Sequence, residues 1–218
     1  MKKATGTSVL LLLLFSWFLT DAQAATTYVS PPPGSVVEGN LENSTEFFWF
    51  FEGQTTLASD LPVDITTSGV YTAPTSLSPG FIAGNTTVNS YLLHFDPVGT
   101  PTEVQSAFGT LSFPYPILGI IVSGSLLGDS DFLGPAGTTY PTDPTWRGLE
   151  FGTGSVADLI IYDSQFNGGL GAITPVLHAS TTGVDQVRIL TGVPAPTSLF
   201  LLGSGLIGLV SFRKRFRR

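Results

Sequence analysis

The strongest constraint on this chain is the separation of its charges around two apolar runs. Seven of the nine Lys and Arg residues lie close to the two ends, beside apolar runs at residues 9–19 and 197–212. From residue 25 to residue 212 only Arg147 and Arg188 are basic, against fifteen acidic residues, which gives a net charge of −13. Cationic flanks of apolar segments stay on the cytoplasmic side of a membrane. The pattern therefore predicts that the acidic middle of the chain is exported.

The first 24 residues have the three parts of a secretory signal peptide. Lys2 and Lys3 form a positive start, the apolar run at 9–19 follows, and Ala22 and Ala24 are small residues of the kind that signal peptidase recognises. The apolar run is too short to span a bilayer comfortably. We predict a signal peptide at 1–24 that signal peptidase removes; the alternative is an uncleaved anchor.

The last 26 residues combine a proline motif, an apolar run and a basic tail. The motif is Val193, Pro194, Ala195 and Pro196, and the tail contains Arg213, Lys214, Arg215, Arg217 and Arg218. As a helix, residues 197–212 would reach ~24 Å, slightly less than a ~30 Å hydrocarbon core, and the flanking arginines can absorb the difference. We predict a transmembrane helix at 197–212 with its tail at 213–218 in the cytoplasm. The alternative is a buried helix of the folded domain.

This order of elements resembles the PEP-CTERM sorting signal, over residues 193–218. Ala195 stands where that family has a glutamate. The resemblance implies recognition by an exosortase and loss of the tail. It also implies a membrane-bound intermediate at the inner membrane, followed by delivery to the cell surface or to an exopolysaccharide matrix. The expected partners are thus the membrane, signal peptidase, exosortase and exopolysaccharide.

The segment between the two ends has the composition of an all-β domain. Only 11% of residues are charged, 42% are hydrophobic, and 25 Gly and 16 Pro residues supply frequent turns. We predict an extended lead-in at 25–40 and an antiparallel sandwich or jelly roll at 41–192, flanked by the signal helix and the transmembrane helix. Strands are expected within 43–52 and at 63–67, 69–73, 88–95, 104–113, 117–122, 148–151, 159–162 and 187–191. Residues 88–191 also resemble domains found ahead of PEP-CTERM signals, a resemblance that implies no activity.

Two features of the middle segment suggest ligand binding. The aromatic run at 47–51 predicts a buried strand, with an exposed platform for sugars as the alternative. Asp129 and Asp131 place two carboxylates between Gly128 and Gly134, and calcium prefers such oxygen ligands. We therefore consider calcium at Asp129 and Asp131, with Asp143, Asp158 and Asp163 as further contributors from later loops. The alternative is a solvated turn.

Little in the sequence points to catalysis. The chain has no cysteine and only two histidines, and His94 is best explained as a packed strand residue. Arg147 and Arg188 are expected to pair with carboxylates, with Glu150 or Asp185 as neighbours in sequence. An acidic exported domain is unsuited to nucleic acid, because phosphates attract Lys and Arg. We expect a non-enzymatic surface or matrix protein with no cofactor other than calcium. A carbohydrate-binding module and a hydrolase that uses carboxylates are the alternatives.

Overall fold

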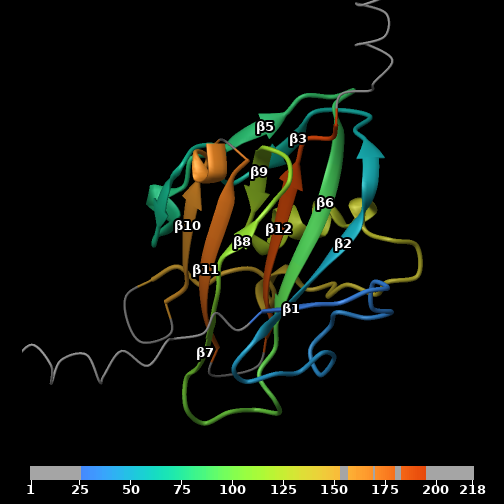
Figure 1. Cartoon of the computed structure of the whole chain (residues 1–218). Coiled ribbons are helices and arrows are strands. Elements are labelled where there is room, and N and C mark those ends of the chain that lie inside the picture. Colours follow the sequence, from blue (N-terminus) through green and yellow to red (C-terminus); the bar gives the residue numbers. More distant parts are fainter. Residues whose placement is uncertain (1–25, 153–156, 169, 180–182, 195–218) are drawn as a thin grey trace, which may run out of the picture.

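The computed structural model shows a mostly β-sheet domain with short helices, as the composition predicts (Figure 1). The structure describes residues 26–152, 157–168, 170–179 and 183–194. Within them, the strands form three sheets. The first has five strands, the second has four neighbouring strands plus the short β8, and the third has two strands.

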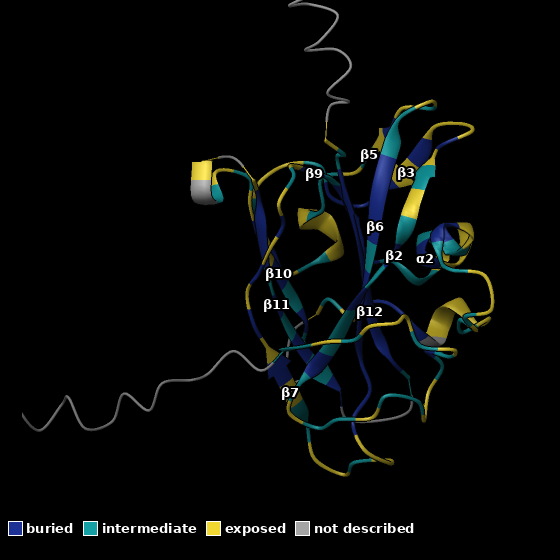
Figure 2. Cartoon of the chain, turned by 45° about the vertical axis from the view of Figure 1, so that its right-hand side comes forward, coloured by how far each residue is buried: buried dark blue, intermediate teal, exposed yellow. Residues whose placement is uncertain are grey.

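The first sheet contains β12 (Asp185–Thr191) as an interior strand. The order is β1 (Thr26–Tyr28), β2 (Phe47–Thr56), β6 (Thr87–Phe95), β12 and β9 (Ile117–Ile121). All neighbouring pairs are antiparallel except β1 and β2, which run parallel. Every residue of β12 is buried, as Figure 2 shows along the strand. A strand that is buried throughout must be covered on both faces of its sheet.

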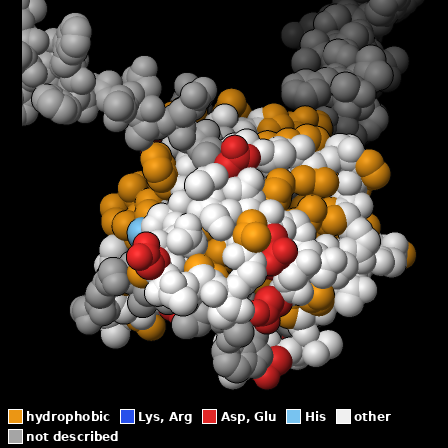
Figure 3. Space-filling model, turned by 90° about the horizontal axis from the view of Figure 1, so that it is seen from below, with side chains coloured by type: hydrophobic (Ala, Val, Ile, Leu, Met, Phe, Trp, Pro, Cys, Tyr) orange, Lys and Arg blue, Asp and Glu red, His pale blue; other side chains and the backbone are white. Residues whose placement is uncertain are grey.

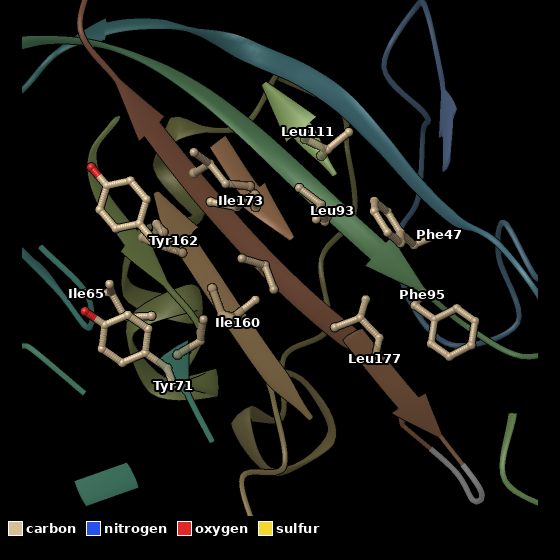
Figure 4. Packing of buried hydrophobic residues seen from close by; sticks show 14 of the residues in the cluster. Phe47, Ile65, Tyr71, Leu93, Phe95, Leu111, Ile160, Tyr162, Ile173 and Leu177 are labelled. Atoms are coloured by element: carbon tan, nitrogen blue, oxygen red, sulfur yellow. The ribbon is translucent and has the colours of Figure 1, made fainter. Parts of the chain in front are cut away.

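The second sheet covers one of these faces. Its order is β4 (Gly69–Tyr71), β10 (Leu159–Asp163), β11 (Ala172–Ala179) and β7 (Gln105–Phe108), and β8 (Leu111–Ser112) also pairs with β11. Figure 4 shows the core between the two sheets, where Phe47, Leu93 and Phe95 of the first sheet meet Ile160 and Leu177 of the second.

The opposite face of the first sheet is covered mainly by loops and short helices. Phe50, Leu92 and Leu190 pack there against Leu127 of α2 (Gly124–Asp129) and Leu133 of η2 (Asp131–Leu133). The small sheet of β3 (Leu61–Val63) and β5 (Gly80–Ile82) and the buried Val36 extend this second core. The helices η1 (Pro74–Ser76), η3 (Pro144–Trp146) and η4 (Phe166–Gly168) lie in connecting loops. We call α2, η2 and the segments around Val36 and Tyr140 the covering layer.

Several of the predicted strands are present in the structure, but some have different bounds or are absent. The predicted strand at 104–113 is divided into β7 and β8, and residues 148–151 form no strand: Arg147 instead makes an isolated bridge to Val184. Strand β11 was not predicted, because Pro175 in its middle cannot donate to a sheet ladder. Pro175 lies where the partner of β11 changes from β7 to β8, and its carbonyl accepts from Gly109 N at 3.4 Å. The missing donor therefore falls where the pairing is already interrupted.

The predicted segments at the two ends lie outside the described residues. These segments are the signal peptide at 1–24, the positions Ala195 and Pro196, the helix at 197–212 and the basic tail. The described part of the chain contains no helix with the length and hydropathy that a bilayer crossing requires.

Helix α2 provides a matched test of the covering layer. A Cβ atom at Gly124 would lie 2.0 Å from Pro144 O and 2.5 Å from Arg147 O, whereas one at Gly128 would meet no atom within 4 Å. We expect Gly124→Ala to lower the free energy of unfolding by at least ~2 kcal/mol, because backbone must move. Gly128→Ala should raise it by up to ~1 kcal/mol through helix propensity. Urea denaturation measures both; equal effects of the two variants would contradict the close packing of α2 against the Pro144 segment.

Candidate functional site

A fully buried arginine lies between the first sheet and the covering layer. Arg188 of β12 is 0% exposed, and its five guanidinium N–H groups all have acceptors. Two of them bind the Glu52 carboxylate side by side, Nε to Oε2 at 2.8 Å and a terminal nitrogen to Oε1 at 2.9 Å. The other three donate to the covering layer: to Leu127 O at 3.0 Å, Ser130 Oγ at 2.6 Å and Asp131 Oδ1 at 3.2 Å.

Both carboxylate oxygens of Glu52 are likewise fully hydrogen-bonded. Its two oxygens also accept from Ser90 Oγ and from the Tyr140 hydroxyl, both at 2.6 Å. Burial alone would raise the pKa of Glu52, but the charge and hydrogen bonds of Arg188 outweigh it, so the pKa is lowered. The pair is thus charged and saturated with hydrogen bonds. Removing one member of such a pair leaves an uncompensated buried charge.

The second arginine extends the network. Arg147 donates to both oxygens of Asp131, at 2.7 and 3.1 Å, and its Nε donates to Gln186 Oε1 at 2.9 Å. Gln186 in turn donates to Val36 O at 2.8 Å and contacts His94 Nδ1 at 3.2 Å. This chain of contacts joins strands β6 and β12 to the covering layer.

His94 is a structural residue of this network. It is fully buried, and its Nε2 lies 2.9 Å from Asn40 O. Burial lowers the pKa of His94 to about 4, so the ring is neutral near pH 7. Its two ring nitrogens face Asn40 and Gln186 rather than the neighbouring Asp96, whose carboxylate accepts from Gly39 N at 2.7 Å. The explanation of His94 as a packed strand residue is consistent with this geometry.

The arginines pair with carboxylates, but not with those expected from sequence proximity. Their partners are Glu52 and Asp131 rather than Glu150 and Asp185. Glu52 is 136 positions from Arg188 in sequence, and pairing across the sheet brings them together. That separation explains why sequence proximity indicated the wrong partners.

The two residues of the predicted calcium pair have different surroundings. Asp129 is exposed at the end of α2, while both oxygens of Asp131 accept from guanidinium groups. A cation at Asp131 would have to compete with two arginines for the same oxygens. The two carboxylates do line one hollow, together with Tyr140 and Arg147.

A different set of carboxylates comes together at the end of the two main sheets where β10 and β12 begin. Glu150, Asp158 and Asp185 each offer an oxygen, and these oxygens lie within 4.8 Å of one another. We call these three residues the acidic cluster. Asp158 and Asp185 are 1% and 2% exposed, and Glu150 lies at the surface. Figure 3 views the molecule from below in Figure 1; several Asp and Glu side chains are visible on that face, and no Lys or Arg of the described residues is.

Two backbone N–H groups fix Asp158. His178 N donates to its Oδ1 at 2.7 Å, and Glu150 N donates to its Oδ2 at 2.8 Å. Burial, with added repulsion from Glu150, raises the pKa of Asp158 to about 7. Burial also raises the pKa of Asp185, well above its usual range, and Asp158 and Glu150 add to the rise. The sequence gives no signal for this set, because its members lie in three separate segments.

The aromatic run of β2 alternates between the two faces of its sheet. Phe47 and Phe50 are buried in the two different cores, which removes both from the predicted sugar platform. Trp49 and Phe51 instead line a groove of about 280 Å³. Tyr28, Tyr91 and Phe113 share this groove, and Asn89 and Ser112 add polar groups to it. Neighbouring ring centroids lie 4.7 Å apart for Tyr28 and Trp49 and 5.2 Å apart for Phe51 and Tyr91.

Comparison with known proteins bears on the C-terminal end of the chain. The PEP-CTERM protein-sorting motif matches residues 192–218. The chain therefore carries a PEP-CTERM sorting motif at residues 192–218. No curated protein and no solved structure matches the chain.

The PEP-CTERM match confirms the predicted sorting signal and implies an exosortase partner. A signal of this kind implies export and processing at a membrane. The matched motif begins directly after β12, since its first residue, Gly192, follows Thr191 in the sequence. The N–H of Gly192 donates to Pro116 O at 2.9 Å. Among the described residues, the last strand therefore ends one residue before the matched motif begins.

Proposed function

We propose that this PEP-CTERM protein is a non-enzymatic component of the cell surface or of an exopolysaccharide matrix. The observation that carries the proposal is the sorting motif at 192–218, which follows the last strand of an acidic domain. The two facing sheets would form a β-sandwich that the C-terminal signal delivers. The basic tail would hold the C-terminus in the cytoplasm until an exosortase removes it.

The charge of the domain supports this destination. Among the described residues the basic side chains are Arg147 and Arg188, and both are engaged with carboxylates. The remaining acidic groups give a surface that favours solubility and repels anionic polymers such as nucleic acids.

The basic tail offers a test of sorting in the full chain. We expect replacement of Arg213, Lys214, Arg215, Arg217 and Arg218 by Gln to reduce the processed surface form, because the positive charges no longer fix the orientation of the tail. A variant with Lys at all five positions keeps the charge and serves as the matched control. Immunoblots of cell fractions measure the processed form. Equal processing of the Gln and Lys variants would contradict the proposed role of the tail.

A second candidate function is carbohydrate binding in the aromatic groove. The supporting observation is the set of rings at Tyr28, Trp49 and Phe51 beside the amide of Asn89. Rings stack on the apolar faces of sugars, and polar groups orient the hydroxyls. Tyr28 is 51% exposed, so one of these rings is open to a ligand.

The ring at Tyr28 allows this candidate to be tested without disturbing the core. We expect Tyr28→Ala to weaken binding to a responsive polysaccharide about fivefold, since an aromatic contact contributes ~1 kcal/mol. Phe81→Ala is the matched control, because Phe81 is 65% exposed on β5 and outside the groove. Affinity electrophoresis in polysaccharide gels measures both variants. Equal retardation of wild type and both variants would argue against the groove.

A further inference from the structure

The acidic cluster lacks a compensating positive charge. Arg147 and Arg188 are the basic side chains of the described residues, and their carboxylate partners are Asp131 and Glu52. The groups that act electrostatically on Asp185 are Asp158, Glu150 and Asp96, all of them acidic. Buried charges in proteins are normally paired or coordinate metals. The cluster is therefore a place where a cation would be strongly favoured.

An unpartnered atom within the cluster points to a ligand. Oδ2 of Asp185 is buried and has no hydrogen-bond partner among the described residues. Asp185 is 2% exposed and faces the interior between the two main sheets, opposite Phe95 of β6. Buried polar atoms without a protein partner are rare, and a bound ion is one of the recognised reasons for them.

The rest of the cluster has the form of a prepared site. The two backbone N–H groups that hold Asp158 leave each of its oxygens with a further lone pair. Glu150 lies at the surface, and one of its oxygens lies within 4.8 Å of oxygens of the two buried carboxylates. The site thus combines fixed buried ligands with an accessible one.

We propose that Glu150, Asp158 and Asp185 bind a calcium ion. The donor set consists of oxygens alone, which suits a hard cation. Two oxygens on one calcium ion can lie at most ~4.8 Å apart, twice the ~2.4 Å ligand distance. All three cluster oxygens satisfy that limit. Water and backbone carbonyl groups would complete the six to eight ligands that calcium takes.

The proposal concerns a site different from the one that the sequence suggested. The exposed Asp129 does not belong to the cluster. Asp129→Asn therefore serves as a matched control for substitutions in the cluster. The proposal is also independent of the sorting function, because the sorting signal can act whether or not calcium is bound.

The test uses the full chain, purified in detergent and freed of metal with a chelator. Calcium is titrated to about 10 mM, above the range of weak extracellular sites. Calorimetry gives the affinity and stoichiometry, and thermal unfolding gives the shift in Tm. We expect one calcium ion to bind and to raise the Tm of wild type and of Asp129→Asn.

Asp185→Asn and Glu150→Gln should each weaken calcium binding at least tenfold. Asp185→Asn should also leave the calcium-free Tm equal to or above that of wild type, because it removes the repulsion between this carboxyl group and its acidic neighbours. If Asp185→Asn fails to fold, Glu150→Gln decides the matter, since Glu150 lies at the surface. The proposal is overturned if wild type shows no calcium response, or if the cluster variants respond like wild type. Loss of binding in Asp129→Asn alone would also overturn it.

Discussion

The buried pair of Arg188 and Glu52 is the interaction on which the rest of this domain depends. It lies on the face of the first sheet that is turned away from the second sheet, where α2 and irregular segments provide the cover. Irregular segments cannot complete their hydrogen bonds within themselves as a sheet does. Arg188 supplies hydrogen bonds to the covering layer, at Leu127 O, Ser130 Oγ and Asp131 Oδ1. It also binds the carboxylate of Glu52 on β2. The polar network thus orders a layer that hydrophobic contact alone would specify less precisely.

This arrangement also determines the electrostatics of the remaining domain. The second arginine joins the same network through Asp131 and Gln186, so both positive side chains of the described residues are concentrated on one face of the sheet. The carboxyl groups between the two sheets, at Asp158 and Asp185, are left without a cationic partner. Burial raises the pKa values of both carboxyl groups, and repulsion from their acidic neighbours adds to the rise. The same lack of a positive partner favours the proposed calcium site. An exported domain with few basic residues can balance the negative charge of such carboxyl groups by binding a cation from its surroundings.

The sequence predicted the general plan of the protein better than its sites. Alternating and apolar runs indicated β2, β6 and β9, because a strand pattern is local. Strand β11 was not predicted. Pro175 in its middle argues against a strand, and the sequence does not show that this residue falls between the segments paired with β7 and β8. The partners of Arg188 and the acidic cluster depend on pairing between distant segments, as in Glu52 with Arg188 and Glu150 with Asp185. The sorting motif was recognisable because its three parts are contiguous in sequence.

A double-mutant cycle on Glu52→Gln and Arg188→Met tests the central role of the buried pair most directly. The free energy of unfolding is measured by denaturation of the full chain, with Glu103→Gln as a control on the exposed surface. We expect each single variant to lose ~3 kcal/mol or more, because it leaves a buried group without its partner, and the double variant to lose much less than the sum. Additive losses below ~1 kcal/mol, like those of exposed ion pairs, would contradict the account.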